Sequence, residues 1–87
     1  MSLLVKVHKT DNVAIAVQPL PAGTEIEGIH INQDIPQAHK VALADIPKGS
    51  PVIRYGVVLG YAMNPIKKGD WINEFMLELP TPPSVDH

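Results

Sequence analysis

The sequence predicts an all-β fold with one or two short helical turns, and three observations carry this prediction. First, a turn that contains glycine recurs three times, in residues 20–26, 46–52 and 66–72. Each copy begins and ends with an apolar residue, and the glycine inside it can take a positive φ without a Cβ clash. Second, residues 13–17 alternate valine or isoleucine with alanine, as a strand does. Third, glycine and proline interrupt the chain too often for long helices.

The first predicted element is a hairpin between residues 3–7 and 13–17. Asp11 and Asn12 lie between these segments, and such side chains can bond the following backbone and reverse the chain. Residues 26–31 contain isoleucines around a glycine and therefore hold at most short strands.

The second half of the chain continues the same pattern. Pro36 makes a helix through residues 34–40 improbable. Residues 41–45 fit either a strand or a single helical turn, and this alternative stays open. Residues 52–62 form strands interrupted by glycine, which indicates a bulge or a sharp corner, and residues 71–77 complete the ordered part. Because such short strands leave edges to be covered, we expect pairing between distant segments.

Length and composition limit the class of protein. The 87 residues suffice for one domain, which buries roughly 60% of the surface of its unfolded chain. The net charge of −2 argues against nucleic acid or an anionic membrane as the partner. The absence of cysteine excludes disulfides and thiolate chemistry. No apolar run approaches the roughly 20 residues of a membrane-spanning helix, so we expect a cytoplasmic protein.

The predicted domain covers residues 1–79. Residues 80–87 contain three prolines and resemble an extended linker that leads toward a further domain. A complete protein can also end in this way, but a fragment of a longer protein is the favoured interpretation.

Two neighbouring pairs of residues are candidates for ligand binding. His39 and Lys40 follow a turn, and together they could hold a carboxylate or act as acid and base. Arg54 offers a bidentate fork and Tyr55 a hydroxyl group. In a strand these last two side chains would point to opposite faces, unless the chain bends there. For both pairs a purely structural role is the competing interpretation: a surface His and Lys, and a solvated Arg beside a core Tyr.

The residues alone do not form a catalytic set. The histidines lack the spacing of metal ligands, and the acidic residues lie where turn formation explains them. Trp71 and Phe75 could share one face of a helix, but core packing is the favoured interpretation for them. We therefore predict no catalytic residue and no metal ligand within this chain.

Three segments together resemble the N-terminal domain of sugar-acid dehydratases of the altronate and galactarate type. They are Val7-His8-x-Thr10-Asp11-Asn12-Val13-Ala14-Ile15, His39-Lys40-Val41-Ala42-Leu43-x-Asp45-Ile46-Pro47 and Ile53-Arg54-Tyr55-Gly56-x-Val58-Leu59-Gly60-Tyr61-Ala62. The resemblance extends in order from Val5 to about Pro80. It implies the β-clip fold of the SAF group, which agrees with the turn-rich β interpretation.

One segment separates the two branches of this family. Residues 69–76 read Gly-Asp-Trp-Ile-Asn-Glu-Phe-Met, which is similar to the Gly-Ser-Trp-Ile-Asp-Glu-Ser-Met of the galactarate branch. The histidine-rich pattern of the altronate branch is missing here, and Arg54 also fits the galactarate branch. Asn73 and Phe75 depart from the galactarate pattern, so the substrate stays open between galactarate, altronate and another sugar acid.

The resemblance implies a hydro-lyase that converts galactarate to 5-dehydro-4-deoxy-glucarate and water. Such enzymes are associated with a divalent metal, often iron, which we expect outside this chain. The expected partners are a large C-terminal catalytic domain and a hexaric or hexonic acid, and a homo-oligomer is compatible with the sequence. We expect His39, Lys40, Arg54 and Tyr55 to contact substrate or cap the active site, and the 87 residues alone to be inactive.

Other functions fit the same resemblance. The chain could be the small subunit of a two-chain lyase such as sulfolactate sulfo-lyase, or a stand-alone SAF module that binds carbohydrate. The reading frame beyond His87 separates a fused catalytic domain from a separate subunit.

Overall fold

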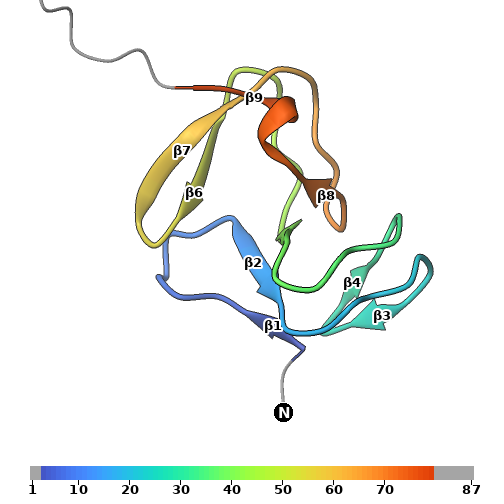
Figure 1. Cartoon of the computed structure of the whole chain (residues 1–87). Helices are drawn as coiled ribbons and strands as arrows, with labels where there is room; N and C mark the ends of the chain where they lie inside the picture. Colours follow the sequence, from blue (N-terminus) through green and yellow to red (C-terminus); the bar gives the residue numbers. More distant parts are fainter. Residues whose placement is uncertain (1–2, 80–87) are drawn as a thin grey trace, which may run out of the picture.

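The computed structural model describes residues 3–79, and this part of the chain consists of short strands and tight turns (Figure 1). The elements are β1 (Leu4–Val5), β2 (Val13–Ala16), β3 (Glu25–Ile26), β4 (Ile29–His30), β5 (Lys40–Ala42), β6 (Pro51–Arg54), β7 (Val57–Ala62), β8 (Trp71–Ile72), the 3-10 turn η1 (Glu74–Met76) and β9 (Leu77–Glu78). The predicted all-β fold with a short helical turn is confirmed. Of residues 41–45, for which a strand and a helical turn were both open, residues 41 and 42 belong to strand β5, and residues 43–45 are neither strand nor helix. The predicted linker, residues 80–87, lies outside the described residues.

The strands form three antiparallel sheets. The central sheet has the order β1-β2-β5-β8, a second sheet has the order β6-β7-β9, and β3 pairs with β4. The predicted hairpin between residues 3–7 and 13–17 is confirmed, since Leu4 pairs with Ala16. The pairings β5–β8 and β7–β9 join segments far apart in the chain, as expected from the need to cover edges. The register shift between β6 and β7 confirms the predicted irregularity in residues 52–62.

The three glycine turns are confirmed and share one backbone geometry. In each turn the residue after glycine donates its N–H to the carbonyl three positions earlier, at 2.9–3.2 Å. The glycines of these turns have φ between 85° and 91°, a conformation that residues with a Cβ rarely adopt.

A fourth turn of this kind spans residues 35–39 and was not predicted, because it lacks glycine. Ala38 takes the glycine position with a φ of 70°. The N–H of His39 donates to the carbonyl of Pro36 at 3.2 Å and closes the turn. The turn leads directly into β5, so it determines where His39 and Lys40 lie.

The four turns form two matching pairs. Leu20 forms a β-bridge with Ile35, and Ile46 forms the equivalent bridge with Ile66. In all four turns the residue at the glycine position donates its N–H to a carbonyl of another segment at 2.8 Å. The two halves of the described chain therefore repeat one architecture around the central sheet.

The hydrophobic core lies on both faces of the central sheet. Successive residues of a strand point to opposite faces, so Ala14 and Ala16 belong to one cluster and Val13 to the other. The first cluster also contains Leu4, Leu20, Ile26, Ile29, Ile31, Ile35 and Val41, and the second contains Ala42, Ile46, Val52, Ala62, Ile66, Ile72 and Leu77. Packing from two sides thus fixes this sheet, in which Trp71 lies on the edge strand β8 and His39 directly precedes β5.

Candidate functional site

A hollow of about 340 Å³ lies beside the paired strands β5 and β8. Its lining consists of His39, Lys40, Trp71, Ile72, Asn73, Glu74 and Phe75. The lining combines aromatic and aliphatic side chains with groups that can carry charge. A mostly apolar wall with a few polar groups is typical of small-molecule sites.

His39 is held by its backbone and by an aromatic neighbour. Its N–H closes the fourth turn, and its carbonyl accepts the N–H of Ala16 at 3.0 Å. The indole Nε1–H of Trp71 donates to Nδ1 of His39 at 3.0 Å. The two rings lie edge to face, with centroids 5.5 Å apart and an interplanar angle of 61°. The imidazole therefore has a defined orientation although it is exposed.

Lys40 contributes a positive charge to the hollow. It lies on β5 between Ile15 of β2 and Ile72 of β8, and its side chain is half-buried. Within residues 3–79 no ion pair of Lys40 with a carboxylate is found. A half-buried lysine without such a partner is suited to an anionic ligand.

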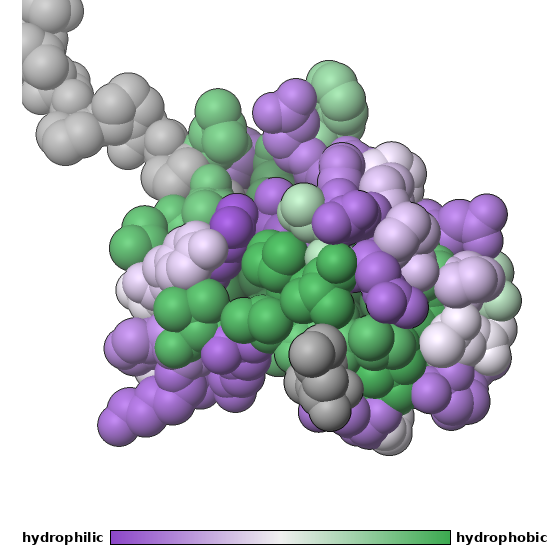
Figure 2. Space-filling view, turned by 60° about the horizontal axis from the view of Figure 1, so that its bottom comes forward, coloured by the Kyte–Doolittle hydropathy of each residue, from purple (hydrophilic) through white to green (hydrophobic). Residues whose placement is uncertain are grey.

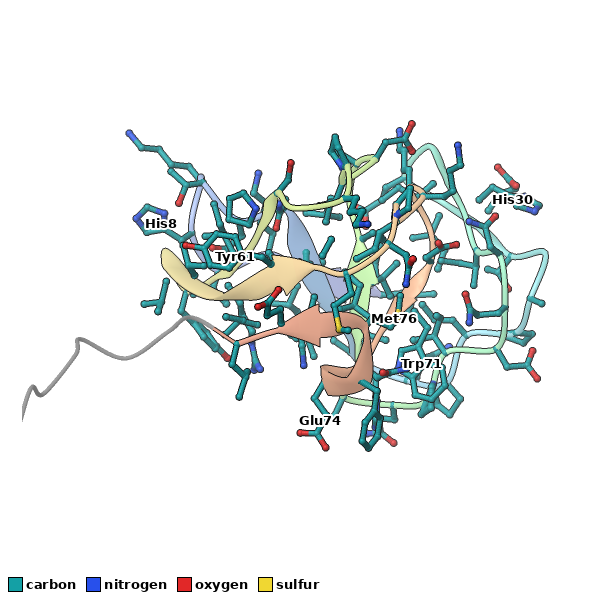
Figure 3. All side chains as sticks on the ribbon, turned by 90° about the horizontal axis from the view of Figure 1, so that it is seen from above. His8, His30, Tyr61, Trp71, Glu74 and Met76 are labelled. Carbon is teal, nitrogen blue, oxygen red and sulfur yellow. The ribbon has the colours of Figure 1, made fainter. Side chains whose placement is uncertain are left out.

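The 3-10 turn η1 forms the rim of the hollow. Asn73 caps the turn, and its side chain accepts the N–H of Phe75 at 2.9 Å. Glu74 follows the cap, and Figure 3 shows it at the outside of the molecule. The prediction that Phe75 belongs to the core is wrong, because its side chain is 84% exposed. The short turn directs it outward, whereas Trp71 on β8 packs half-buried against the first core cluster.

Arg54 and Tyr55 lie at the tip of the β6–β7 hairpin and not in the lining of the hollow. The chain does bend there, since Tyr55 and Gly56 have φ of 55° and 71° in a two-residue hairpin turn. The bend brings the two side chains together: the Arg54 guanidinium lies 4.5 Å from the centre of the Tyr55 ring and donates from Nη2 to its hydroxyl at 3.0 Å. The expected solvated Arg beside a core Tyr is reversed, because Tyr55 is 52% exposed and Arg54 is half-buried.

The four predicted site residues therefore fall into two groups. His39 and Lys40 line the hollow. The Tyr55–Gly56 turn instead lies against the ring of His8: a Cβ added to Gly56 would lie 3.3–3.4 Å from atoms of that ring. Figure 3 shows His8 and Trp71 in different parts of the molecule. Substrate contact stays a prediction for all four residues, and the geometry favours the hollow as the place for it.

Asp11 holds the backbone of the hairpin turn beside Arg54 and Tyr55. The sequence indicates it only as a turn residue. It is 5% exposed. One carboxylate oxygen accepts the N–H groups of His8 and Tyr55 at 3.0 Å each, and the other accepts that of Gly56 at 2.8 Å. Burial raises the pKa of Asp11, but these backbone donors, Gly56 foremost, and the nearby His8 bring it below its ordinary value of 3.8. The carboxylate thus fastens the first loop to the distant hairpin.

This arrangement predicts a pH-dependent stability. A carboxyl group whose pKa is lowered by folding stabilises the protein at pH values above its ordinary value of 3.8, and the effect is lost as the pH falls through the lowered pKa. We expect an Asp11→Asn variant to melt at a lower temperature than the native chain at about pH 7, and the difference to shrink as the pH falls below 3.8. Thermal unfolding followed by circular dichroism measures both. A difference that stays constant over this range contradicts the role of the carboxylate.

Neither a metal centre nor a spanning helix is found in the described part of the chain. Residues 3–79 contain no group of three or more His, Cys, Asp or Glu side chains that could hold a metal ion. Among the same residues, no helix has the length and apolar character needed to cross a membrane.

Comparison with known proteins agrees with the geometry. A family model described as altronate/galactarate dehydratase SAF domain matches residues 2–80. The chain belongs to this family. The SAF family resemblance inferred from the three sequence segments is thereby confirmed, and the turn-rich β structure is consistent with a small β-clip domain.

Relatives of this SAF domain include two kinds of lyase. Galactarate dehydratase (L-threo-forming) of Escherichia coli is 52% identical over 84 residues, which cover 93% of this chain and 16% of that enzyme. Altronate dehydratase of Escherichia coli is 44% identical over 69 residues, or 75% of this chain and 14% of the enzyme. The (2R)-sulfolactate sulfo-lyase subunit alpha of Chromohalobacter salexigens is 28% identical over 85 residues, or 84% of this chain and 90% of the subunit. The SAF domain thus spans only about one sixth of the galactarate dehydratase.

Proposed function

We propose that this SAF domain is the accessory domain of a galactarate-type dehydratase, in which His39 and Lys40 hold a carboxylate of the sugar acid. The main support for this proposal is the hollow, whose lining combines Lys40, which has no ion-pair partner among the described residues, with the oriented imidazole of His39. Sugar acids are anionic and rich in hydroxyl groups, so they require a cation and directional hydrogen bonds. The aromatic wall of Trp71 and Phe75 suits the C–H face of such a molecule.

The comparisons support the galactarate branch over the altronate branch. Identity to the galactarate dehydratase is 52%, against 44% and 31% to the altronate dehydratases of Escherichia coli and Bacillus subtilis. The segment from Gly69 to Met76, which suggests the same branch in the sequence, contains five of the seven residues that line the hollow: Trp71, Ile72, Asn73, Glu74 and Phe75. The part of the chain that separates the branches is thus the part that surrounds the proposed ligand.

The chemistry explains why an accessory domain should bind a carboxylate. A dehydration removes a proton from the carbon beside a carboxylate and expels the hydroxyl of the next carbon as water. The resulting enol becomes a ketone by moving its proton to carbon. Negative charge builds up on the carboxylate oxygens as the proton leaves, and a cation and a hydrogen-bond donor stabilise it. Lys40 and His39 would supply these two interactions, and the proton transfers would take place on the larger part of the enzyme.

Among residues 3–79, no group of three or more His, Cys, Asp or Glu side chains comes together in a way that could hold a metal ion. The expectation of a metal elsewhere in the dehydratase stays a prediction.

A large catalytic region is the proposed partner. The dehydratases related to this chain are about six times longer than the part that matches it. Hydrophobic side chains such as Phe75, Val5 and Val7 are exposed, and Figure 2 shows hydrophobic side chains in the middle of one face of the molecule. Exposed apolar surface is suited to a domain that packs against a catalytic region.

Substrate turnover by the intact enzyme tests the proposal. The enzyme that contains this domain is assayed with galactarate, altronate and sulfolactate in the presence of added divalent metal. We expect dehydration of galactarate with a kcat/KM at least roughly tenfold above that for altronate. Turnover of altronate without turnover of galactarate would contradict the assignment to the galactarate branch. Inactivity of the 87-residue chain alone is expected.

A second candidate function has one specific observation in its favour. The sulfolactate sulfo-lyase alpha subunit matches this chain over 90% of its own length, so a domain of this size also occurs as a separate polypeptide. In that case the chain would be the small subunit of a two-chain lyase. Co-purification with a separately encoded large subunit, together with turnover of sulfolactate, would favour this function over the first.

A further inference from the structure

The hydrogen bond between Trp71 and His39 determines where the proton of the imidazole lies. An indole N–H can only donate. The bond from Trp71 Nε1 to His39 Nδ1, at 3.0 Å, therefore requires a lone pair on Nδ1. In a neutral imidazole with a bare Nδ1 the proton is on Nε2. His39 is thus the Nε2–H tautomer as long as the indole contact persists.

Trp71 is fixed more firmly than its partner. It lies on β8 opposite Val41 of β5, and its side chain packs against the first core cluster. Its backbone N–H donates to the side-chain oxygen of Gln33 at 3.2 Å. His39, in contrast, is exposed and precedes its strand. The indole of Trp71 therefore determines the orientation of the His39 imidazole, and the imidazole does not determine that of the indole.

We propose that Trp71 is a positioning residue that keeps His39 as the Nε2–H tautomer, so that His39 is a hydrogen-bond donor to an oxygen anion and not a proton acceptor. Both ring nitrogens are accounted for: Nδ1 accepts from Trp71, and Nε2 carries its own proton. The imidazole can take up a second proton only by giving up the indole bond. Of the two roles considered for His39 from the sequence, carboxylate binding is thereby favoured over acid–base chemistry.

The neighbouring Lys40 complements this donor. Its ammonium supplies charge on a flexible stem, whereas the locked imidazole supplies direction. Among the described residues of the hollow, Glu74 is the one carboxylate, and it lies at the outer rim. A ligand that carries both a carboxylate and hydroxyl groups matches this arrangement. The identity of the ligand rests on the proposed function, but the tautomer of His39 does not.

Nitrogen NMR of the 87-residue chain, which has its own core, tests the tautomer directly. In a ¹⁵N-labelled sample at about pH 8, imidazoles are neutral and the two tautomers give distinct shifts for Nδ1 and Nε2. We expect His39 to show an unprotonated Nδ1 and a protonated Nε2. A Trp71→Phe variant keeps an aromatic ring but lacks the N–H, and it should show a mixture of tautomers. Backbone amide spectra establish that the variant is folded. The ring nitrogen shifts of His30, which does not contact Trp71 (Figure 3), should be the same in the native chain and the variant.

Two results would overturn the inference: a proton on Nδ1 of His39 in the native chain, or the same tautomer in the folded Trp71→Phe variant. The spectrum of the native chain alone shows whether Nδ1 of His39 carries a proton, so the inference can be tested even when the variant does not fold.

Kinetics of the intact enzyme separate this inference from the proposed function. Loss of one oriented hydrogen bond should lower kcat/KM for galactarate roughly threefold to tenfold in Trp71→Phe, because His39 would stabilise the charge that develops on the carboxylate. The Nε2–H tautomer in the native chain together with an unchanged kcat/KM in both Trp71→Phe and His39→Ala would refute substrate binding at the hollow and leave the tautomer assignment intact. A mixed tautomer in the native chain would refute the positioning role whatever the kinetics show.

Discussion

Replacement of Gly69 by alanine is expected to destabilise the domain strongly, whereas the same replacement at Gly49 is expected to be tolerated. Both glycines lie in equivalent turns, with φ of 91° and 85°. A Cβ at Gly69 would lie 1.9 Å from the backbone carbonyl oxygen of His30, but a Cβ at Gly49 would meet no atom within 4 Å. The two variants therefore share the backbone strain and differ only in the clash.

The magnitudes follow from this difference. Alanine at a positive φ costs on the order of 1 kcal/mol, which lowers the melting temperature by about 4–8 °C. At Gly69 the clash involves backbone, so we expect a loss of at least about 3 kcal/mol. A domain of this size has a total stability of only about 4–13 kcal/mol. Melting curves of the two purified variants measure the contrast, and equal melting temperatures would show that the β4 segment does not pack against this turn.

Replacement of His39 by alanine is expected to lower kcat/KM of the intact enzyme strongly. A hydrogen bond to a charged group is worth about 1.5–3 kcal/mol, which corresponds to a roughly 10–100-fold change in kcat/KM for galactarate. His30→Ala is the matched control. His30 is exposed, pairs with Glu25 on the β3–β4 hairpin and does not line the hollow. Figure 3 shows it away from Trp71.

Steady-state kinetics of the intact enzyme measure the effect, with Lys40→Ala as a second variant. We expect Lys40→Ala to lower kcat/KM by a similar factor and His30→Ala to change it by less than about twofold. Equal kcat/KM values for the His39 and His30 variants would place the carboxylate site outside the hollow.

The turns were the most predictable part of the fold. Three of the four turns contain glycine at a positive φ, and this requirement is visible in the sequence. The fourth was missed because Ala38 adopts the same conformation without the glycine that signals it. The position of a strand could be inferred from alternation, but the sequence does not contain the register of β5 against β8, because the two strands are far apart in the chain.

The candidate site was predictable only in part. His39 and Lys40 stand next to each other in the sequence, and the structure places both in one hollow. Trp71 could not be connected with His39, since their contact depends on the pairing of β5 with β8. The exposure of Phe75 was missed because a four-residue spacing suggests a helix face, and the 3-10 turn is too short to form one. The contact between Arg54 and Tyr55 depends on the positive φ of Tyr55, for which the sequence offers only the following glycine as a hint.

A structure of the intact enzyme with bound galactarate shows whether the hollow beside β5 and β8 receives a substrate carboxylate. We expect a carboxylate oxygen within about 3 Å of His39 Nε2, with the Lys40 ammonium on the same group. The indole of Trp71 should still donate to Nδ1. A bound sugar acid whose two carboxylates contact only residues of the catalytic region, with the hollow empty or filled by that region, would show that His39 and Lys40 do not bind the substrate.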